Sequence, residues 1–163
     1  YYLAVSRLVG YKKVDLAVKA FNKLGYSLVI IGTGREEKKL KRMAGNNIKF
    51  AGQVSEKELT MYYGSAKALI MPQEEDFGIV AVEAQSFGVP VIAYKKGGAI
   101  DTVIPDKTGI FFEEQEPESL ITAVRKFERM TFDPKVLKAN SNKFSKDKFK
   151  REFVEVVKNA RMF

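Results

Sequence analysis

The chain has 163 residues, enough for one domain with a sizeable core, and its 45% hydrophobic content is that of a folded protein. It contains neither cysteine nor histidine, which excludes disulfides, thiolate or imidazole metal sites and imidazole base catalysis. Residues 1–124 carry 16 Lys or Arg against 15 Asp or Glu, a net of +1, whereas residues 125–163 carry 12 against 5, a net of +7. A uniformly basic nucleic-acid-binding domain is therefore not indicated.

No apolar run approaches the roughly 20 residues that cross a bilayer, and no signal peptide is visible. We therefore expect a cytoplasmic protein. The chain opens directly on YYLAVS, which has the character of a strand, so we also expect it to begin within a longer protein.

Short apolar runs alternate with helical patterns along the chain. Strands are predicted at 1–6, 27–32, 48–52, 67–72 and 89–94, with a last strand ending at 112. Helices are predicted at 14–24, 36–43, from the capping box at Ser55 onward, near 77–88, and in two or three pieces over 118–163. This alternation predicts a doubly wound parallel α/β sheet of about six strands in a single domain. Its core spans about 1–130, and a basic helical tail spans about 131–163.

In such a sheet, ligands bind at the carboxyl ends of the strands, where four loops carry unusual residues. The loop after the first strand holds Arg7 and Lys12 around a short turn. Two cations at this position could clamp an anion such as a diphosphate. The alternative is that both are solvated surface cations.

The loop after the second strand contains Gly32 and Gly34, which resemble the start of a dinucleotide fingerprint. Glu37 stands where the third glycine of that fingerprint would be, and the motif follows the second strand instead of the first. A nicotinamide or flavin site is therefore not predicted. A tight turn, with or without a ligand against its backbone, is the favoured interpretation.

The loop after the fourth strand, QEEDFG, leads into a helix that begins near Phe77 or Gly78. Free amides and the positive end of the helix dipole could hold a phosphate there, because Gly78 has no side chain to block it. The alternative is that residues 74–76 only cap the helix. Glu83, inside the apolar run that follows, could simply face solvent.

The loop after the fifth strand contains Gly97 and Gly98 ahead of a short helix, with Asp101 in its first turn. Backbone amides there could bind a hydroxyl or a phosphate. An ordinary turn is the alternative.

Taken together and in order, these motifs resemble the C-terminal, donor-binding domain of a GT-B glycosyltransferase of the group 1 family (family 4, retaining). The resemblance runs from Leu3 to about Phe112, and the helical tail fits as well. The matching residues are Arg7 and Lys12 in R-L-x-x-x-K, the strand-two glycines Gly32 and Gly34, Phe50, Gly52 and Val54 in F-x-G-x-V, Glu75 and Glu83 with seven residues between them, and Gly97, Gly98 and Asp101 in G-G-x-x-E.

The resemblance implies a role for each matched position. Arg7 and Lys12 would neutralise the donor diphosphate without a metal ion, Glu75 would contact the transferred sugar, and Glu83 would bind the ribose hydroxyls. The backbone at Phe77, Gly78 and Ile79 would cradle sugar or phosphate, and the region of Gly52 and Val54 would lie beside the base. Asp76 and Asp101 depart from the family pattern, which usually has Gly and Glu at these positions.

The run EEDFG followed by GGAIDTV resembles mannosyltransferases of polysaccharide assembly that use GDP-mannose. The implied partners are a GDP- or UDP-linked sugar and the acceptor-binding half of the same enzyme, with no cofactor, no metal and no nucleic acid. Because that half is absent, the resemblance implies a chain that binds donor without efficient transfer.

Alternatives remain for the function and for the tail. The chain could be a nucleotide-sugar epimerase of the same fold, or a non-catalytic binding module that acts through its basic tail. The run from Lys143 to Arg161 could be a solvated basic face, could cross back to the other half of the enzyme, or could contact anionic lipid at the membrane.

Overall fold

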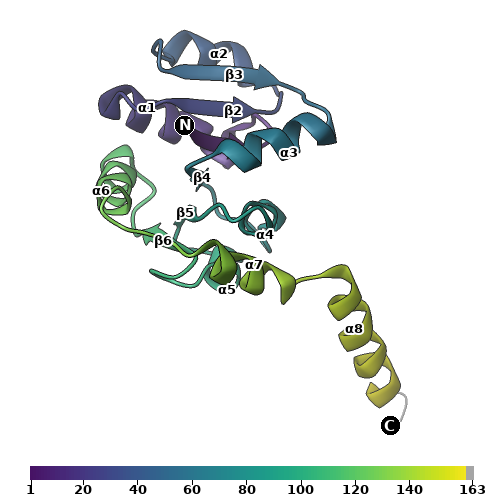
Figure 1. Ribbon diagram of the computed structural model, residues 1–163. Helices are drawn as coiled ribbons and strands as arrows, with labels where there is room; N and C mark the ends of the chain where they lie inside the picture. Colours follow the sequence, from purple (N-terminus) through teal and green to yellow (C-terminus); the bar gives the residue numbers. More distant parts are fainter. Residues whose placement is uncertain (161–163) are drawn as a thin grey trace.

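In the computed structural model, which describes residues 1–160, the centre of the molecule is one sheet of six parallel strands (Figure 1). The strands are β1 (Tyr2–Val5), β2 (Leu28–Ile31), β3 (Ile48–Gly52), β4 (Ala68–Met71), β5 (Val91–Tyr94) and β6 (Gly109–Phe112). Their order is β3-β2-β1-β4-β5-β6, with Tyr2 in register with Leu28 on one side and with Ala68 on the other. The strand order reverses between β1 and β4, which is where doubly wound sheets bind their ligands. The predicted fold class is confirmed.

Helices fill the connections between the strands. They are η1 (Gly10–Lys12), α1 (Val14–Leu24), α2 (Glu37–Met43), α3 (Glu56–Ser65), α4 (Ile79–Ser86), α5 (Ala99–Thr102), α6 (Pro117–Phe127), α7 (Pro134–Asn142) and α8 (Lys146–Ala160). The capping box predicted at the start of α3 is present, because the Ser55 hydroxyl accepts from the Glu58 N–H while the Glu58 carboxylate accepts from the Ser55 N–H. Pro134 begins α7, at the position where its missing N–H is tolerated, so the helical tail is divided there into separate pieces, as predicted.

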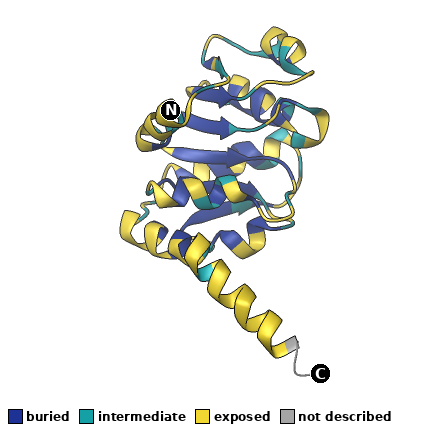
Figure 2. Cartoon of the chain, turned by 90° about the vertical axis from the view of Figure 1, so that its right-hand side faces the viewer, coloured by how far each residue is buried: buried dark blue, intermediate teal, exposed yellow. Residues whose placement is uncertain are grey.

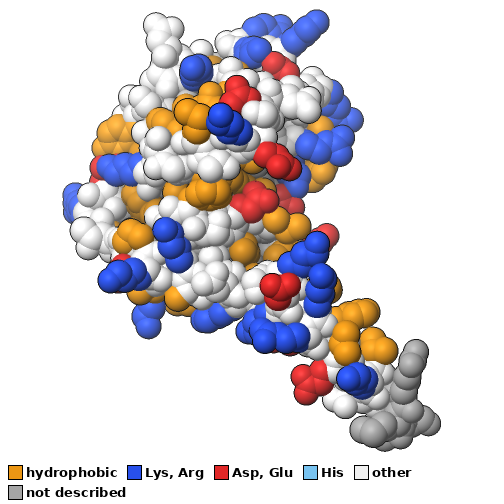
Figure 3. All heavy atoms as spheres, turned by 45° about the vertical axis from the view of Figure 1, so that its right-hand side comes forward, with side chains coloured by type: hydrophobic (Ala, Val, Ile, Leu, Met, Phe, Trp, Pro, Cys, Tyr) orange, Lys and Arg blue, Asp and Glu red, His pale blue; other side chains and the backbone are white. Residues whose placement is uncertain are grey.

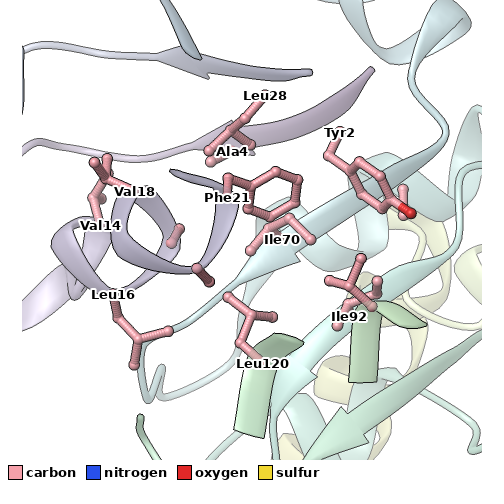
Figure 4. Packing of buried hydrophobic residues seen from close by; sticks show 14 of the residues in the cluster. Tyr2, Ala4, Val14, Leu16, Val18, Phe21, Leu28, Ile70, Ile92 and Leu120 are labelled. Carbon is pink, nitrogen blue, oxygen red and sulfur yellow. The ribbon is translucent and has the colours of Figure 1, made fainter. Parts of the chain in front are cut away.

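Alternate residues of each strand face opposite sides of the sheet, and this divides the core into two layers. On one side, Tyr2 and Ala4 pack with α1 and α6. Figure 4 shows Phe21 of α1 beside Ile70 in this layer. On the other side, Leu3 packs with residues of α3, α4 and α5. Because the central strands are buried on both faces, they appear in the sequence as continuous apolar runs (Figure 2).

A buried polar cluster fixes α7 against the helix that follows β4. The Asn140 Nδ2 donates to Gln85 Oε1 at 2.7 Å and to the Thr102 carbonyl O at 2.9 Å. The Gln85 Nε2 donates to the same Thr102 carbonyl at 2.9 Å. Buried polar groups that satisfy one another in this way specify a single packing of α4, α5 and α7.

Helix α8 leaves the body of the molecule, and its residues 146–159 are exposed apart from Lys148, which is intermediate (Figures 1 and 2). Phe149 is 66% exposed and Phe153 is 58% exposed. Figure 3 shows hydrophobic, Lys and Arg side chains together along this helix. The three alternatives for the tail therefore stay predictions, and Arg161 lies outside the described residues. Within residues 1–160, no helix has the length and apolar character to cross a bilayer.

Candidate functional site

The loops that follow β1, β2 and β3 surround a cavity of about 800 Å³ at the carboxyl edge of the sheet. Its walls are both polar and apolar, with Arg7 and Arg35 as the cations that line it. The other lining residues are Val5, Ser6, Val9, Tyr11, Ile31, Gly32, Thr33, Gly34, Gln53, Val54, Leu59 and Val80. A volume of this size accommodates a small organic ligand, and the walls offer apolar surface for a flat ring beside two positive charges.

Gly32 and Gly34 are required by the packing of the β1 and β2 loops against each other. A Cβ built at Gly32 would overlap the Ser6 carbonyl, and one at Gly34 would lie 2.8 Å from the Leu8 N. The Leu8 N–H donates to the Thr33 carbonyl at 2.9 Å, which ties the same two loops together. The glycines thus form the tight turn that the sequence favoured, and they bring the backbones of both loops to the cavity wall.

A second cavity, of about 290 Å³, lies where the loop after β4 meets the loop after β1, and Lys12, Glu75 and Asp76 line it. The Lys12 ammonium forms an ion pair with Glu75 Oε1. The Gln73 Nε2 donates to the same oxygen at 2.8 Å. The structure therefore brings Lys12 and Glu75, which are 63 residues apart, into direct contact at one edge of the sheet.

Helix α4 points its amino terminus into the smaller cavity. Its N-cap residue, Gly78, has φ 79° and ψ 50°, a left-handed conformation that glycine adopts readily, and it is buried against Met71. The first N–H groups of a helix have no acceptor inside it. In α4 the first such bond back to Gly78 comes from the Ala81 N–H, which donates to the Gly78 carbonyl. Val80 lines both cavities, so the larger and the smaller cavity adjoin at the first turn of α4.

Gly97 and Gly98 lie directly on the backbone of the loop after β4 that contains residues 74–76, called here the acidic loop. The Gly98 N–H donates to the Glu75 carbonyl at 2.6 Å, and a Cβ at Gly98 would lie 2.5 Å from the Asp76 carbonyl O. The Gly98 amide is therefore engaged by protein. The β5 loop supports the β4 loop from behind, and only residues without a side chain fit at this contact.

The remaining acidic positions have separate surroundings. Glu74 forms an ion pair with Lys96 at 3.2 Å, so this carboxylate of the acidic residues 74–76 has a partner outside the two cavities. Asp76 is exposed at the rim of the smaller cavity. Asp101 is exposed on α5 and lines neither of the two cavities. Within residues 1–160, Asp and Glu side chains do not gather in groups of three that could hold a metal ion.

Glu83 lies on α4 one turn beyond Val80, and its carboxylate is held by a tyrosine from α3. The Tyr63 hydroxyl donates to Glu83 Oε2 at 3.1 Å. Burial, followed by the charge of Glu83, raises the pKa of the Tyr63 phenol well above its usual value, so the phenol stays a neutral donor. Glu83 does not line the two polar cavities but borders a third, largely apolar cavity of about 580 Å³ between α4 and the start of α8.

The structure thus gathers most of the predicted site residues along one edge of the sheet. Arg7, Gly32, Gly34 and Val54 line the larger cavity, and Lys12, Glu75, Phe77, Gly78 and Ile79 line the smaller one. Gly52 supports the larger cavity from outside, because its carbonyl accepts from the Gly32 N–H at 2.8 Å. Sequence reasoning missed Arg35, Gln73 and Tyr63. Arg35 follows Gly34 directly and could have been found from that position, whereas the contact of Tyr63 with Glu83 has no local signal.

Comparison with known proteins gives a consistent result. Residues 1–144 match the family described as Glycosyl transferases group 1. A GDP-mannose-dependent monoacylated alpha-(1-6)-phosphatidylinositol monomannoside mannosyltransferase of Corynebacterium glutamicum is 36% identical over 71% of this chain and 34% of its own length. A glycogen synthase of Thermus thermophilus is 30% identical over 96% of this chain and 38% of its own length. The chain therefore spans between about a third and two fifths of the length of these relatives.

Solved structures share the fold at lower sequence identity. The apo lipopolysaccharide outer core galactosyltransferase WaaB superposes with a TM-score of 0.85 at 17% identity, over 98% of this chain and 49% of that one. The Anabaena protein HepE in complex with UDP superposes with a TM-score of 0.82 at 20% identity, also over 98% of this chain and 49% of that one. At these identities the likeness concerns the fold alone.

Proposed function

Since the chain belongs to the Glycosyl transferases group 1 family, we propose that it is the donor-binding domain of a retaining glycosyltransferase that transfers a hexose from a nucleotide diphosphate sugar. The observation that carries this proposal is the pair of adjoining cavities at the strand-order reversal. One offers apolar and cationic walls, and the other combines a cation, a carboxylate and a helix amino terminus. The two together suit a nucleotide, a diphosphate and a sugar in that order.

Each part of the donor finds a suitable group in this arrangement. The base would occupy the larger cavity, beside Val54. The ribose would extend from that cavity past Val80, so that its hydroxyls reach Glu83 one turn further along α4. The diphosphate would lie between Arg7 and Lys12, near the amino terminus of α4, where cations and helix amides stabilise the charge that grows on a departing diphosphate. A carboxylate is an acceptor for sugar hydroxyls, which suits Glu75 to the transferred hexose.

We propose mannose from GDP-mannose as the donor, for transfer to a glycan or a lipid-linked acceptor in polysaccharide assembly. The support is the EEDFG and GGAIDTV segments together with relatives whose names specify GDP-mannose. Other relatives are glycogen synthases, and related folds were solved with UDP and UDP-glucose, so UDP-glucose is the donor to compare. Acceptor binding and efficient transfer would need the part of the enzyme outside the length that this chain shares with its relatives.

Calorimetric titration with GDP-mannose and UDP-glucose tests the proposal. We expect saturable binding of one of them, and we expect Glu83→Ala to weaken binding of the free nucleoside diphosphate more than Glu75→Ala does. Glu75→Ala should instead remove the extra affinity that the sugar contributes. The reverse ranking of the two variants would contradict the roles given to these carboxylates.

A further inference from the structure

Gln73 is a buried polar residue beside the smaller cavity, and the proposed function gives it no role. It follows Pro72 at the end of β4 and is 3% exposed. The backbone on either side of it is fixed, because the Gln115 Nε2 donates to the Pro72 carbonyl at 2.9 Å and the Gly98 N–H donates to the Glu75 carbonyl at 2.6 Å. The Gln73 side chain is therefore held in one place by a loop that cannot easily shift.

Gln73 and Lys12 both donate to one oxygen of Glu75. The Gln73 Nε2 lies 2.8 Å from Glu75 Oε1, and the Lys12 Nζ pairs with the same atom. Among the described residues, no side-chain donor reaches the other carboxylate oxygen, Oε2. Two donors on Oε1 fix the plane of the carboxylate and leave Oε2 as its open acceptor.

The orientation of the Gln73 amide is set by the hydrogen bond that its Nε2 donates to Glu75, because its oxygen accepts no hydrogen bond within residues 1–160. Gln73 Oε1 is buried and has no hydrogen-bond partner among the described residues. A buried acceptor without a donor is unfavourable, so the bond on the other side of the amide must compensate. That bond goes to a carboxylate, and a hydrogen bond to a charged acceptor is roughly twice as strong as a neutral one. Turning the amide over would place its oxygen against the Glu75 oxygen.

We propose that Gln73 is a positioning residue for Glu75 in donor binding, an inference that depends on the proposed function. Lys12 is the cation that the proposed function assigns to the diphosphate, so its ammonium must be shared between Glu75 and the phosphate once donor binds. Gln73 is neutral and buried, and the diphosphate does not compete for it. It keeps Glu75 Oε1 occupied and Oε2 directed to a hydroxyl of the transferred sugar while Lys12 turns to the phosphate.

Calorimetry on the 163-residue chain tests this role by comparing the nucleotide sugar, GDP-mannose or UDP-glucose, with the matching nucleoside diphosphate. Gln73→Met keeps the length of the side chain and removes its donor. We expect it to weaken binding of the nucleotide sugar about tenfold, the size of one lost hydrogen bond to a charged group. Affinity for the nucleoside diphosphate should change by less than roughly twofold, because Glu75 faces the sugar.

Gln73→Glu distinguishes positioning from loop stability through its pH profile. Two adjacent carboxylates cannot both be charged easily, so one of them gains a proton well above the usual pKa of a carboxyl group. The protonated form restores a donor toward Glu75, so the affinity of this variant relative to wild type should rise as the pH falls from roughly 8 to about 5. Gln115→Met, which loosens the same loop at Pro72, should keep the wild-type pH profile. The Gln73→Glu profile also carries the test if Gln73→Met does not fold.

Each outcome has one meaning. A sugar-dependent gain in affinity that Glu75→Ala abolishes but Gln73→Met leaves intact would overturn the role of Gln73 alone. A Gln73→Glu profile parallel to that of wild type would do the same. If wild type binds the nucleotide sugar no more tightly than the nucleoside diphosphate, the role of Glu75 toward the sugar and this inference are wrong, whereas the absence of binding of either ligand would overturn the proposed function itself.

Discussion

Replacing Gly98 by alanine should disturb the acidic loop through a single added methyl group. Gly98 has φ −62° and ψ −10°, a conformation that alanine adopts without strain, so any effect arises from packing. The added Cβ would lie 2.5 Å from the Asp76 carbonyl O, whereas ordinary contact begins at 3.4 Å, which leaves a shortfall of 0.9 Å. The loop that carries Glu75 and leads into α4 must therefore move.

The expected size follows from two contributions. Overpacking of this kind costs about 1–3 kcal/mol. Weakening the hydrogen bond from the Gly98 N–H to the Glu75 carbonyl adds about 1 kcal/mol. We therefore expect the free energy of unfolding to fall by about 2–4 kcal/mol, which lowers Tm by roughly 6–12 °C for a middle value of about 3 kcal/mol in a domain of this size. Nucleotide-sugar affinity should fall as well, because Glu75 and the amino terminus of α4 move together.

Gly64→Ala is the matched control for this substitution. Gly64 also has helical backbone, within α3, and a Cβ there would meet no other atom within 4 Å. Alanine is the better helix former, so this variant should be more stable by about 0.5–1 kcal/mol. Thermal and urea unfolding followed by circular dichroism compare the two variants. A Gly98→Ala protein as stable as Gly64→Ala would refute the packing of the β5 loop on the acidic loop.

Three further predictions concern individual side chains. Tyr63→Phe removes the donor to Glu83 and should weaken nucleoside diphosphate binding severalfold in calorimetry; a loss that persists in the Glu83→Ala background would contradict this coupling. The pKa of Glu128 is lowered by the hydrogen bond from Lys67, so its contribution to stability is present above a pH of about 4.3 and is lost as the pH falls through the lowered pKa. Glu128→Gln should therefore reduce the free energy of unfolding by up to about 1 kcal/mol at about pH 7 but not at about pH 3, as measured by urea titration, and an equal loss at both pH values would exclude this mechanism. Phe21→Ala should destabilise the core by about 3–5 kcal/mol in the same assay, and a loss below about 1 kcal/mol would show that the α1 layer is not packed as described.

The fold could be predicted because its signals are local. Apolar runs bounded by glycine or proline fixed the strands, and the capping box at Ser55 fixed the start of α3. The order of the strands was not predicted and comes from the structure, because no single segment determines it. Helix α8 was predicted as a helix, but its surroundings were not, because its apolar residues carry no information about what they contact.

The site was predictable as a set of loops but not as a set of contacts. Lys12 and Glu75 were assigned to one site from separate motifs, and only the structure shows that they pair. Gly97 and Gly98 were expected to offer amides to a ligand, whereas the Gly98 amide and the absence of side chains serve the packing of the neighbouring loop. Such contacts join residues far apart in sequence, so their cause cannot be read from either segment alone. Asp76 is exposed, and nothing in the structure explains why an acid stands there.

Chemical-shift mapping of backbone amides during titration with GDP-mannose and UDP-glucose tests the central claim most directly, because it reports both binding and its location. We expect the largest shifts at Arg7, Gly34, Gly78 and Val80, the residues whose loops meet where the two cavities adjoin. Neither Arg7→Ala nor Lys12→Ala should bind with wild-type affinity. Shifts confined to α8, or no shifts at millimolar nucleotide sugar, would contradict the account.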